Sequence, residues 1–208
     1  MSQLKNIIFD LGGVLINLDF VKSTDAFRDL GFPHFENMFS QFKSDQLFEK
    51  LEQGMIGESA FYSVLLKVGK KGITTEQVKF AWNSMLLDFR EKSLSFLKEL
   101  KKNYSLYLLS NTNAIHLNAF NNILKAQIGE ASLDPFFVKA WYSHLIGLRK
   151  PNADIFEFVL KDGGINAEET LFIDDTKGNI ITAQKLGFKT HLLLPGEKIE
   201  ELSYDVYK

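Results

Sequence analysis

The chain has 208 residues, of which 45% are hydrophobic and 24% charged, a composition typical of a folded protein with one medium core, or one core and a small lid. Its formal charge is −2 and its Lys and Arg residues are scattered, which argues against binding to nucleic acid or to an anionic membrane. The absence of cysteine excludes disulfides, thiolate zinc sites and cysteine nucleophiles.

The first predicted element is a short buried strand over residues 7–9, which ends at Asp10. This apolar run is too short for a signal peptide, and no later segment approaches the roughly 18 apolar residues of a membrane span. We therefore expect a cytoplasmic protein without a membrane partner. The pair Gly12-Gly13 follows the strand, and by itself it fits a simple turn as well as a functional loop.

Residues 18–90 have the pattern of helices. Apolar residues recur at helical spacing over 47–51 and again over 61–68. Ser44 and Thr74 are candidate N-caps, and the stretch has no strand signal. The sequence therefore predicts a small all-helical cap domain, inserted after the first strand.

Short apolar runs alternate with helical segments in the rest of the chain. Runs of this length are typical of strands buried on both faces of a parallel sheet. The alternation predicts an α/β fold with a doubly wound parallel sheet, in which residues 1–17 and 91–208 form the core domain and 18–90 the cap domain. The later predicted strands are 106–109, 171–173 and 191–194, and the predicted helices are 114–128, 153–161 and 179–186.

Polar residues stand where three of the predicted strands end. Asp10 follows the first strand, Ser110 the second, and the pair Asp174-Asp175 a later one. Since ligands of such sheets bind at the carboxyl ends of the strands, we expect these side chains to lie together. Adjacent carboxylates repel each other unless a cation lies nearby, and helix capping would explain only one of them. The pair therefore favours a metal site.

These segments together resemble the four motifs of the haloacid dehalogenase (HAD) superfamily. Residues 7–14 resemble the first motif, 108–112 the second, 147–151 the third and 172–175 the fourth, in the family's order and over essentially the whole chain. The helical insertion is similar to the cap of those family members that carry an all-helical cap after the first motif. Within the family, the chain most resembles a bacterial glucose-1-phosphate phosphatase group, which also carries glycine at the position of Gly12. The resemblance implies a Rossmann-like core with an inserted cap.

The resemblance also implies a magnesium-dependent phosphatase acting on a small phosphomonoester, chiefly a sugar phosphate, with Asp10 as the nucleophile. A carboxylate can attack phosphorus and form an aspartyl-phosphate, which divides one difficult displacement into two easier ones. Mg²⁺ prefers oxygen ligands. Asp10, the backbone carbonyl of Gly12 and Asp175 would bind the metal, and Asp174 would do so directly or through water.

The resemblance assigns phosphate binding to residues of the second and third motifs. Ser110 and the Asn111 amide would donate hydrogen bonds to phosphate oxygens, and Lys150 would stabilise charge on the phosphoryl group and the nucleophile. Asn179 is expected to orient the loop rather than to bind metal. His116 could reach the pocket, although a surface or partly buried helical position is the favoured interpretation.

Gly12 is a departure from the family pattern, because most family phosphatases have there a second aspartate that acts as general acid and base. General acid–base catalysis is worth roughly 10²–10⁴ in rate. Three interpretations of the glycine stay open. In the first the leaving group needs little help, in the second water or a lid residue replaces the aspartate, and in the third the protein has lost turnover.

Two other functions remain as competitors. A dehalogenase would use no metal, and in the family it usually carries an aromatic residue at the position of Gly12. A non-catalytic protein that binds phosphorylated metabolites would explain the glycine but not the retention of the other motif residues. The sequence names neither the substrate nor the oligomeric state.

Overall fold

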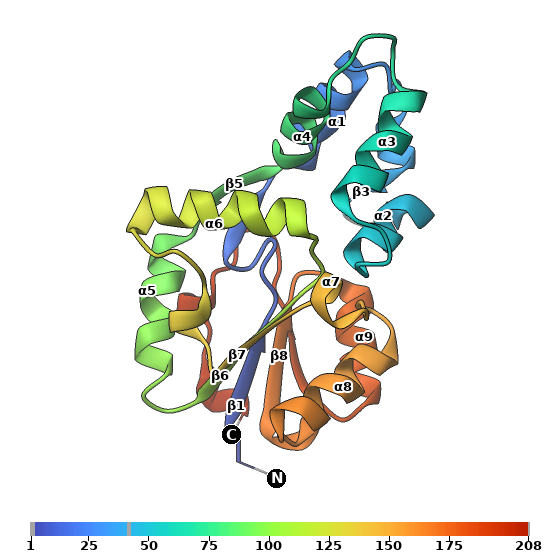
Figure 1. Cartoon of the computed structure of the whole chain (residues 1–208). Coiled ribbons are helices and arrows are strands. Elements are labelled where there is room, and N and C mark those ends of the chain that lie inside the picture. The colour runs from blue at the N-terminus through green and yellow to red at the C-terminus, as the bar shows by residue number, and fades with distance from the viewer. Residues whose placement is uncertain (1–2, 41–42, 208) are drawn as a thin grey trace.

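A parallel β-sheet forms the centre of the molecule, whose computed structural model describes residues 3–40 and 43–207. Within the described residues this sheet has five strands in the order β7-β6-β1-β8-β9 (Figure 1). All neighbouring pairs are parallel and the strand order reverses at the central strand, which confirms the predicted doubly wound fold. The strands are β1 (Asn6–Phe9), β6 (Ser105–Ser110), β7 (Lys139–Tyr142), β8 (Thr170–Asp174) and β9 (Lys189–Leu192).

Helices cover both faces of the sheet, which is why the central strand is apolar without alternation. Ile7 and Phe9 share an apolar cluster with residues of α5 (Glu91–Leu100) and α6 (Ala114–Ile128), whereas Ile8 shares one with residues of α8 (Ala153–Gly163) and α9 (Lys177–Lys185). The two pairs of helices lie on opposite sides of the sheet (Figure 1). The shorter helical elements are α7 (Ser143–Ile146), η1 (Phe35–Asn37), η2 (Asp134–Phe136), η3 (Ala167–Glu169), η4 (Ile199–Glu201) and η5 (Tyr204–Tyr207). None of the described helices combines the length and apolar character needed to cross a membrane.

A second group of helices stands on one end of the sheet and forms the cap (Figure 1). It consists of α1 (Phe20–Asp29), α2 (Gln46–Glu52), α3 (Glu58–Val68) and α4 (Thr75–Asn83). These helices enclose an aromatic cluster of their own, in which Phe48 lies 5.0 Å from Trp82 between ring centroids. Much of the phenylalanine of the sequence is used here: Phe27, Phe32, Phe35, Phe48 and Phe61.

The prediction that residues 18–90 contain no strand is wrong. The structure has β3 (Phe39–Ser40) paired with β4 (Lys43–Ser44), and β5 (Leu86–Phe89) paired antiparallel with β2 (Ile16–Leu18). Strands of two to four residues are too short to show a period of two, so the sequence carries no usable signal for them.

One of the two predicted N-caps is also wrong. Ser44 lies in β4, and it is Asp45 that caps α2, where its carboxylate accepts hydrogen bonds from the amides of Leu47 and Phe48. Thr74 caps α4 as predicted, and together with Gln77 it forms a capping box.

The antiparallel pair of β2 and β5 joins the cap to the sheet. The chain enters the cap after β2 and returns through β5, and Arg90 ties the two by donating from Nε to Asn17 Oδ1 at 2.8 Å. The predicted domain boundaries, 17/18 and 90/91, fall at this pair. The division into two domains stays a prediction.

Candidate active site

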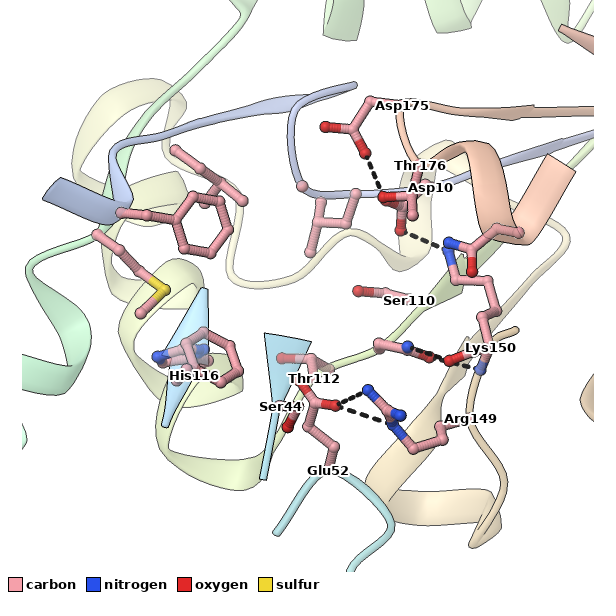
Figure 2. A pocket seen from close by; sticks show the side chains of 18 of the residues that line it. Asp10, Ser44, Glu52, Ser110, Thr112, His116, Arg149, Lys150, Asp175 and Thr176 are labelled. Carbon is pink, nitrogen blue, oxygen red and sulfur yellow. Dashed lines mark hydrogen bonds and ion pairs between the residues drawn. The ribbon is translucent and has the colours of Figure 1, made fainter. Parts of the chain in front are cut away.

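The carboxyl ends of β6, β1 and β8 meet beneath the cap. Asp10 follows β1, Ser110 ends β6 and Asp174 ends β8, and because these three strands are neighbours, their terminal side chains gather at one edge. A cavity of about 560 Å³ opens at this edge, between sheet and cap. Asp10, Ser110, Lys150 and Asp175 are among the residues that line it (Figure 2).

Lys150 is buried in the centre of the site. Its side chain is 1% exposed, and Nζ donates to Asp10 Oδ1 at 2.8 Å, to Asp174 Oδ2 at 2.7 Å and to the Leu109 carbonyl at 2.8 Å. Burial would lower the pKa of this amine, but the attraction of the two carboxylates outweighs it and raises the pKa above its ordinary value. Lys150 is therefore a fixed cation rather than a solvated surface lysine.

Asn111 holds the loop that carries Lys150. Its Oδ1 accepts from the Lys150 amide at 2.9 Å, and its Nδ2 donates to the Lys150 carbonyl at 2.8 Å. Both polar ends of the side chain thus contact the backbone of Lys150. Sequence reasoning missed Ser143, whose hydroxyl accepts from the Thr112 amide and donates to the Thr112 carbonyl, both at 2.9 Å.

Asp174 is fully buried and hydrogen-bonded through both oxygens. Oδ1 accepts from the Thr176 amide at 2.7 Å, and Oδ2 accepts from Lys150. Asn179 Nδ2 donates to both oxygens, at 3.0 and 2.9 Å, in agreement with its expected orienting role. Asp175 is less enclosed and accepts from the Thr176 hydroxyl at 3.1 Å.

The three carboxylates form a group suited to a cation. Oxygens of Asp10, Asp174 and Asp175 all lie within 4.8 Å of one another. Burial raises the pKa of Asp10 to about 7, since the lowering effect of Lys150 is offset by the other two carboxylates. Burial and Asp174 likewise raise the pKa of Asp175. Three acidic groups face one ammonium, so the site lacks positive charge, and its oxygen donors fit a hard divalent cation such as Mg²⁺.

The first loop wraps closely around this group. Gly13 has a φ of +68°, and a Cβ there would lie 2.2 Å from Asp175 Oδ2, so the position requires glycine. Gly12 differs: a Cβ would meet the flexible end of Leu18, with Cδ1 at 2.7 Å. Leu18 also lines the cavity. An apolar methyl group therefore occupies the place where a side chain at position 12 would begin.

The cap contributes charged groups that sequence reasoning missed. Glu52 Oε2 accepts from Arg149 Nη2 at 2.9 Å and from Nε at 3.1 Å, and Glu49 Oε1 accepts from Arg149 Nη1 at 3.0 Å. All three residues line the cavity. The glutamates come from α2 and Arg149 from the core loop about a hundred residues later, a separation for which the sequence has no local signal.

His116 proves to be both buried and part of the cavity wall. Its ring stacks on Trp82 with centroids 4.4 Å apart, and Nε2 lies 3.1 Å from the Trp82 carbonyl. Burial lowers the pKa of His116 to about 4, so the ring is neutral near neutral pH.

A doubly wound sheet that carries an aspartate after its first strand, a buried lysine and paired carboxylates at one edge defines the class of HAD-like hydrolases. Residues 4–187 match the family model described as haloacid dehalogenase-like hydrolase. The chain therefore belongs to the HAD-like hydrolase family, as the sequence motifs imply.

The chain is similar to two characterised phosphatases. It is 32% identical over 188 residues to D-ribitol-5-phosphate phosphatase of Bacteroides thetaiotaomicron, an alignment that covers 90% of this chain and 91% of that protein. It is 29% identical to glyceraldehyde 3-phosphate phosphatase of Methanocaldococcus jannaschii, over 99% of this chain and 91% of that protein. The narrower resemblance to glucose-1-phosphate phosphatases stays a prediction.

Solved structures of the family agree with the fold. A HAD family enzyme of Bacteroides thetaiotaomicron, crystallised with magnesium and inorganic phosphate, superposes with a TM-score of 0.86 at 34% identity, covering 99% of this chain and all of that one. A HAD-like hydrolase of Porphyromonas gingivalis gives a TM-score of 0.85 at 37% identity over 94% of each chain.

Proposed function

We propose that the protein is a magnesium-dependent phosphatase that hydrolyses a small phosphomonoester, chiefly a sugar phosphate, through a phospho-aspartate on Asp10. The observation that carries this proposal is the buried ammonium of Lys150 between Asp10 and Asp174, at the edge where Ser110 also ends its strand. A fixed cation beside an acidic nucleophile reduces the repulsion that an incoming phosphate dianion would otherwise meet. The similarity to D-ribitol-5-phosphate phosphatase and glyceraldehyde 3-phosphate phosphatase supports the substrate class.

In the first step an oxygen of Asp10 attacks phosphorus, and the bond from phosphorus to the ester oxygen breaks. The Ser110 hydroxyl and the Asn111 backbone amide would donate to the phosphoryl oxygens, and Lys150 holds Asp10 in place while it balances the developing charge. Water then attacks phosphorus, releases phosphate and restores the Asp10 carboxylate.

A magnesium ion would be held by Asp10, the backbone carbonyl of Gly12 and Asp175. Asp174, whose oxygens already bind Lys150 and Asn179, would act directly or through water. When bound, the ion supplies positive charge that neutralises both the nucleophile and the phosphate.

Position 12 gives no proton to the departing oxygen, because Gly12 has no side chain and Leu18 covers it. We propose that a leaving group more acidic than a simple alcohol, such as an anomeric hydroxyl or an acid, departs with little help, and that water protonates poorer ones. Hydrolysis should therefore be faster for acyl and anomeric phosphates than for alkyl phosphates of similar size.

Phosphate release from a panel of substrates tests the proposal. The panel holds ribitol 5-phosphate, glyceraldehyde 3-phosphate, glucose 1-phosphate and acetyl phosphate, each with Mg²⁺ and with EDTA. We expect turnover that needs Mg²⁺ and falls by roughly 10³-fold or more in Asp10→Asn. Asp29→Asn, at an exposed position of α1, is the matched control and should be unchanged.

Unchanged phosphate release in Asp10→Asn would overturn the proposed mechanism. Metabolite binding without any turnover would favour the non-catalytic alternative, and chloride release that persists in EDTA would favour a dehalogenase.

A further inference from the structure

The cavity beyond Asp10 has a charged wall on the side of the cap. Glu49 and Glu52 of α2 and Arg149 of the core loop form it. Ser44 and Thr112 lie beside Glu52 and Arg149 (Figure 2). These residues line the same cavity as the candidate nucleophile, so the group joined to a phosphate at Asp10 shares the cavity with them.

Arg149 fixes both carboxylates but uses only one oxygen of each. Its three nitrogens bind Glu52 Oε2 and Glu49 Oε1. Glu52 is 9% exposed and Arg149 17% exposed at the side chain, so neither can reorient freely. The second oxygens, Glu52 Oε1 and Glu49 Oε2, take no part in these bonds. Glu52 Oε1 is therefore an acceptor held in place by Arg149, an arrangement that binds hydroxyl groups with little ordering cost. Glu49 Oε2 is a second acceptor, on a side chain that is 42% exposed and oriented by one hydrogen bond to Arg149.

The charge of this wall limits what it can bind. Burial raises the pKa of Glu52, while the attraction of Arg149 opposes this shift. With both carboxylates ionised, two carboxylates against one guanidinium leave one net negative charge, which would repel a carboxylate or a second phosphate on the substrate. A purely apolar group would displace water from the carboxylates without replacing its hydrogen bonds, which is costly. Neutral hydroxyl donors meet neither penalty.

Another part of the cavity lining is apolar. Leu18, Phe20, Phe39 and Leu86 line it, and each is only partly buried by its own packing. A polyhydroxylated carbon chain presents both hydroxyl groups and C–H surface, so it can meet both walls at once. A chain with only one of these surfaces leaves one wall unmatched.

We propose that Glu49 and Glu52, oriented by Arg149, are the residues that select a neutral polyhydroxylated leaving group by accepting its hydroxyl hydrogen bonds. This inference rests on the proposed phosphatase function. It assigns the selectivity to cap residues that the sequence motifs do not include.

Three substrates distinguish a role of the two glutamates in substrate selection from a role in the phosphatase reaction itself. Ribitol 5-phosphate and n-pentyl phosphate have the same chain length and a primary alcohol leaving group, and differ in their hydroxyl groups. Phenyl phosphate, with an acidic leaving group, reports the phosphatase chemistry alone. In Glu52→Gln and in Glu49→Gln we expect kcat/KM for ribitol 5-phosphate to fall roughly ten-fold or more, mainly through KM. The other two substrates should change by less than about three-fold, within ordinary context effects. Glu76→Gln, at an exposed position of α4, is the matched control.

Equal losses on ribitol 5-phosphate and n-pentyl phosphate would overturn the inference, because they would show that the charges merely hold the cap on the core. A wild-type preference for n-pentyl phosphate would also overturn it.

Glu49 is the more exposed partner, so Glu49→Gln keeps the test valid if Glu52→Gln does not fold. If no substrate releases phosphate, the phosphatase proposal fails; calorimetric binding of ribitol 5-phosphate by wild type and Glu49→Gln then decides the inference separately, and equal affinities overturn it.

Discussion

Lys150 sets the charge balance of the candidate site. It contacts Asp10 and Asp174 simultaneously, and the Asn111 side chain clamps its backbone. A lysine with this burial cannot be exchanged for a neutral residue without leaving the two carboxylates facing each other. Its ammonium is therefore as much a part of the fold as of the proposed reaction.

Replacing Lys150 with methionine keeps the length of the side chain and removes its charge. We predict a fall in kcat of roughly 10²–10³-fold, as for the loss of a group that stabilises transition-state charge. The free energy of unfolding should also fall, by roughly 3–5 kcal/mol, because a buried ion group loses its cation. Steady-state kinetics and urea unfolding measure the two effects. Lys71→Met, at an exposed position, should change neither, and full activity in Lys150→Met would contradict the proposed role.

Gly12 and Leu18 together determine how much help the leaving group receives. Gly12→Asp alone meets Leu18 Cδ1, so the carboxylate should be accommodated best when Leu18→Ala is added. We predict that the double variant gains roughly ten-fold or more on n-pentyl phosphate, a fraction of what a well-placed general acid supplies. Phenyl phosphate, whose leaving group needs little help, should gain much less. Equal gains on both substrates, or a gain in Leu18→Ala alone, would show that acid catalysis is not the cause.

His116 should make the stability of the protein depend on pH. Its pKa is about 4 when folded against an ordinary value of 6.5, so the unfolded chain binds the proton more strongly between these values. Stability from this group is complete above pH 6.5 and declines as the pH falls toward 4, by roughly 3 kcal/mol in total. Urea unfolding at several pH values should show this decline reduced in His116→Gln. Parallel stability curves for the two proteins would contradict it.

At the scale of elements, the predicted helix over 114–128 matches α6. The structure shows why its ends are sharp: Asn113 caps α6 with its side chain, and Gly129 ends it in the left-handed conformation. The edge strand β7 is absent from the prediction, because its four residues mix lysine with aromatic side chains and show no apolar run. The very short strands of the cap arise from tertiary packing, which a local pattern does not encode.

The candidate site, like the secondary structure, could be predicted from the sequence only in part. Asp10, Ser110 and Asp174 could be grouped from the sequence because each ends an apolar strand, and sheet topology brings such ends together. Glu52 and Arg149 could not be paired, because only the docking of α2 against the core sets their contact. Family motifs predicted the proposed chemistry, whereas the proposed selectivity rests on the three-dimensional arrangement.

The corrected N-cap of α2 leads to a prediction of its own. Asp45→Ala should lower the free energy of unfolding by about 1 kcal/mol, since it removes the carboxylate that accepts from two amides of the first turn. Ser44→Ala, one residue earlier, should have a smaller effect because Ser44 caps nothing. Thermal unfolding of the two variants compares them directly, and a larger loss in Ser44→Ala would contradict the assignment.

At the scale of the whole molecule, the cavity lies between the helices α1 to α4 and one edge of the sheet. One apolar cluster is built mainly by these helices and also includes Ile115 of α6, and two others lie on the faces of the sheet. The β2–β5 pair and the ion pairs of Arg149 with Glu49 and Glu52 connect these helices to the rest of the chain. We propose that residues 18–90 act as a cap domain over a core of 1–17 and 91–208. The chemistry would then belong to the core and the choice of substrate to the cap.

The proposed mechanism requires that Asp10 becomes phosphorylated during turnover. Acid quenching during steady-state hydrolysis of phenyl phosphate, followed by mass spectrometry of the peptide that contains residues 7–14, detects this intermediate. We expect a phosphoryl group on Asp10 that is lost under mild alkali, and none in Asp10→Asn. Sustained turnover without phosphorylation of this peptide, or with the phosphoryl group on another residue, would contradict it.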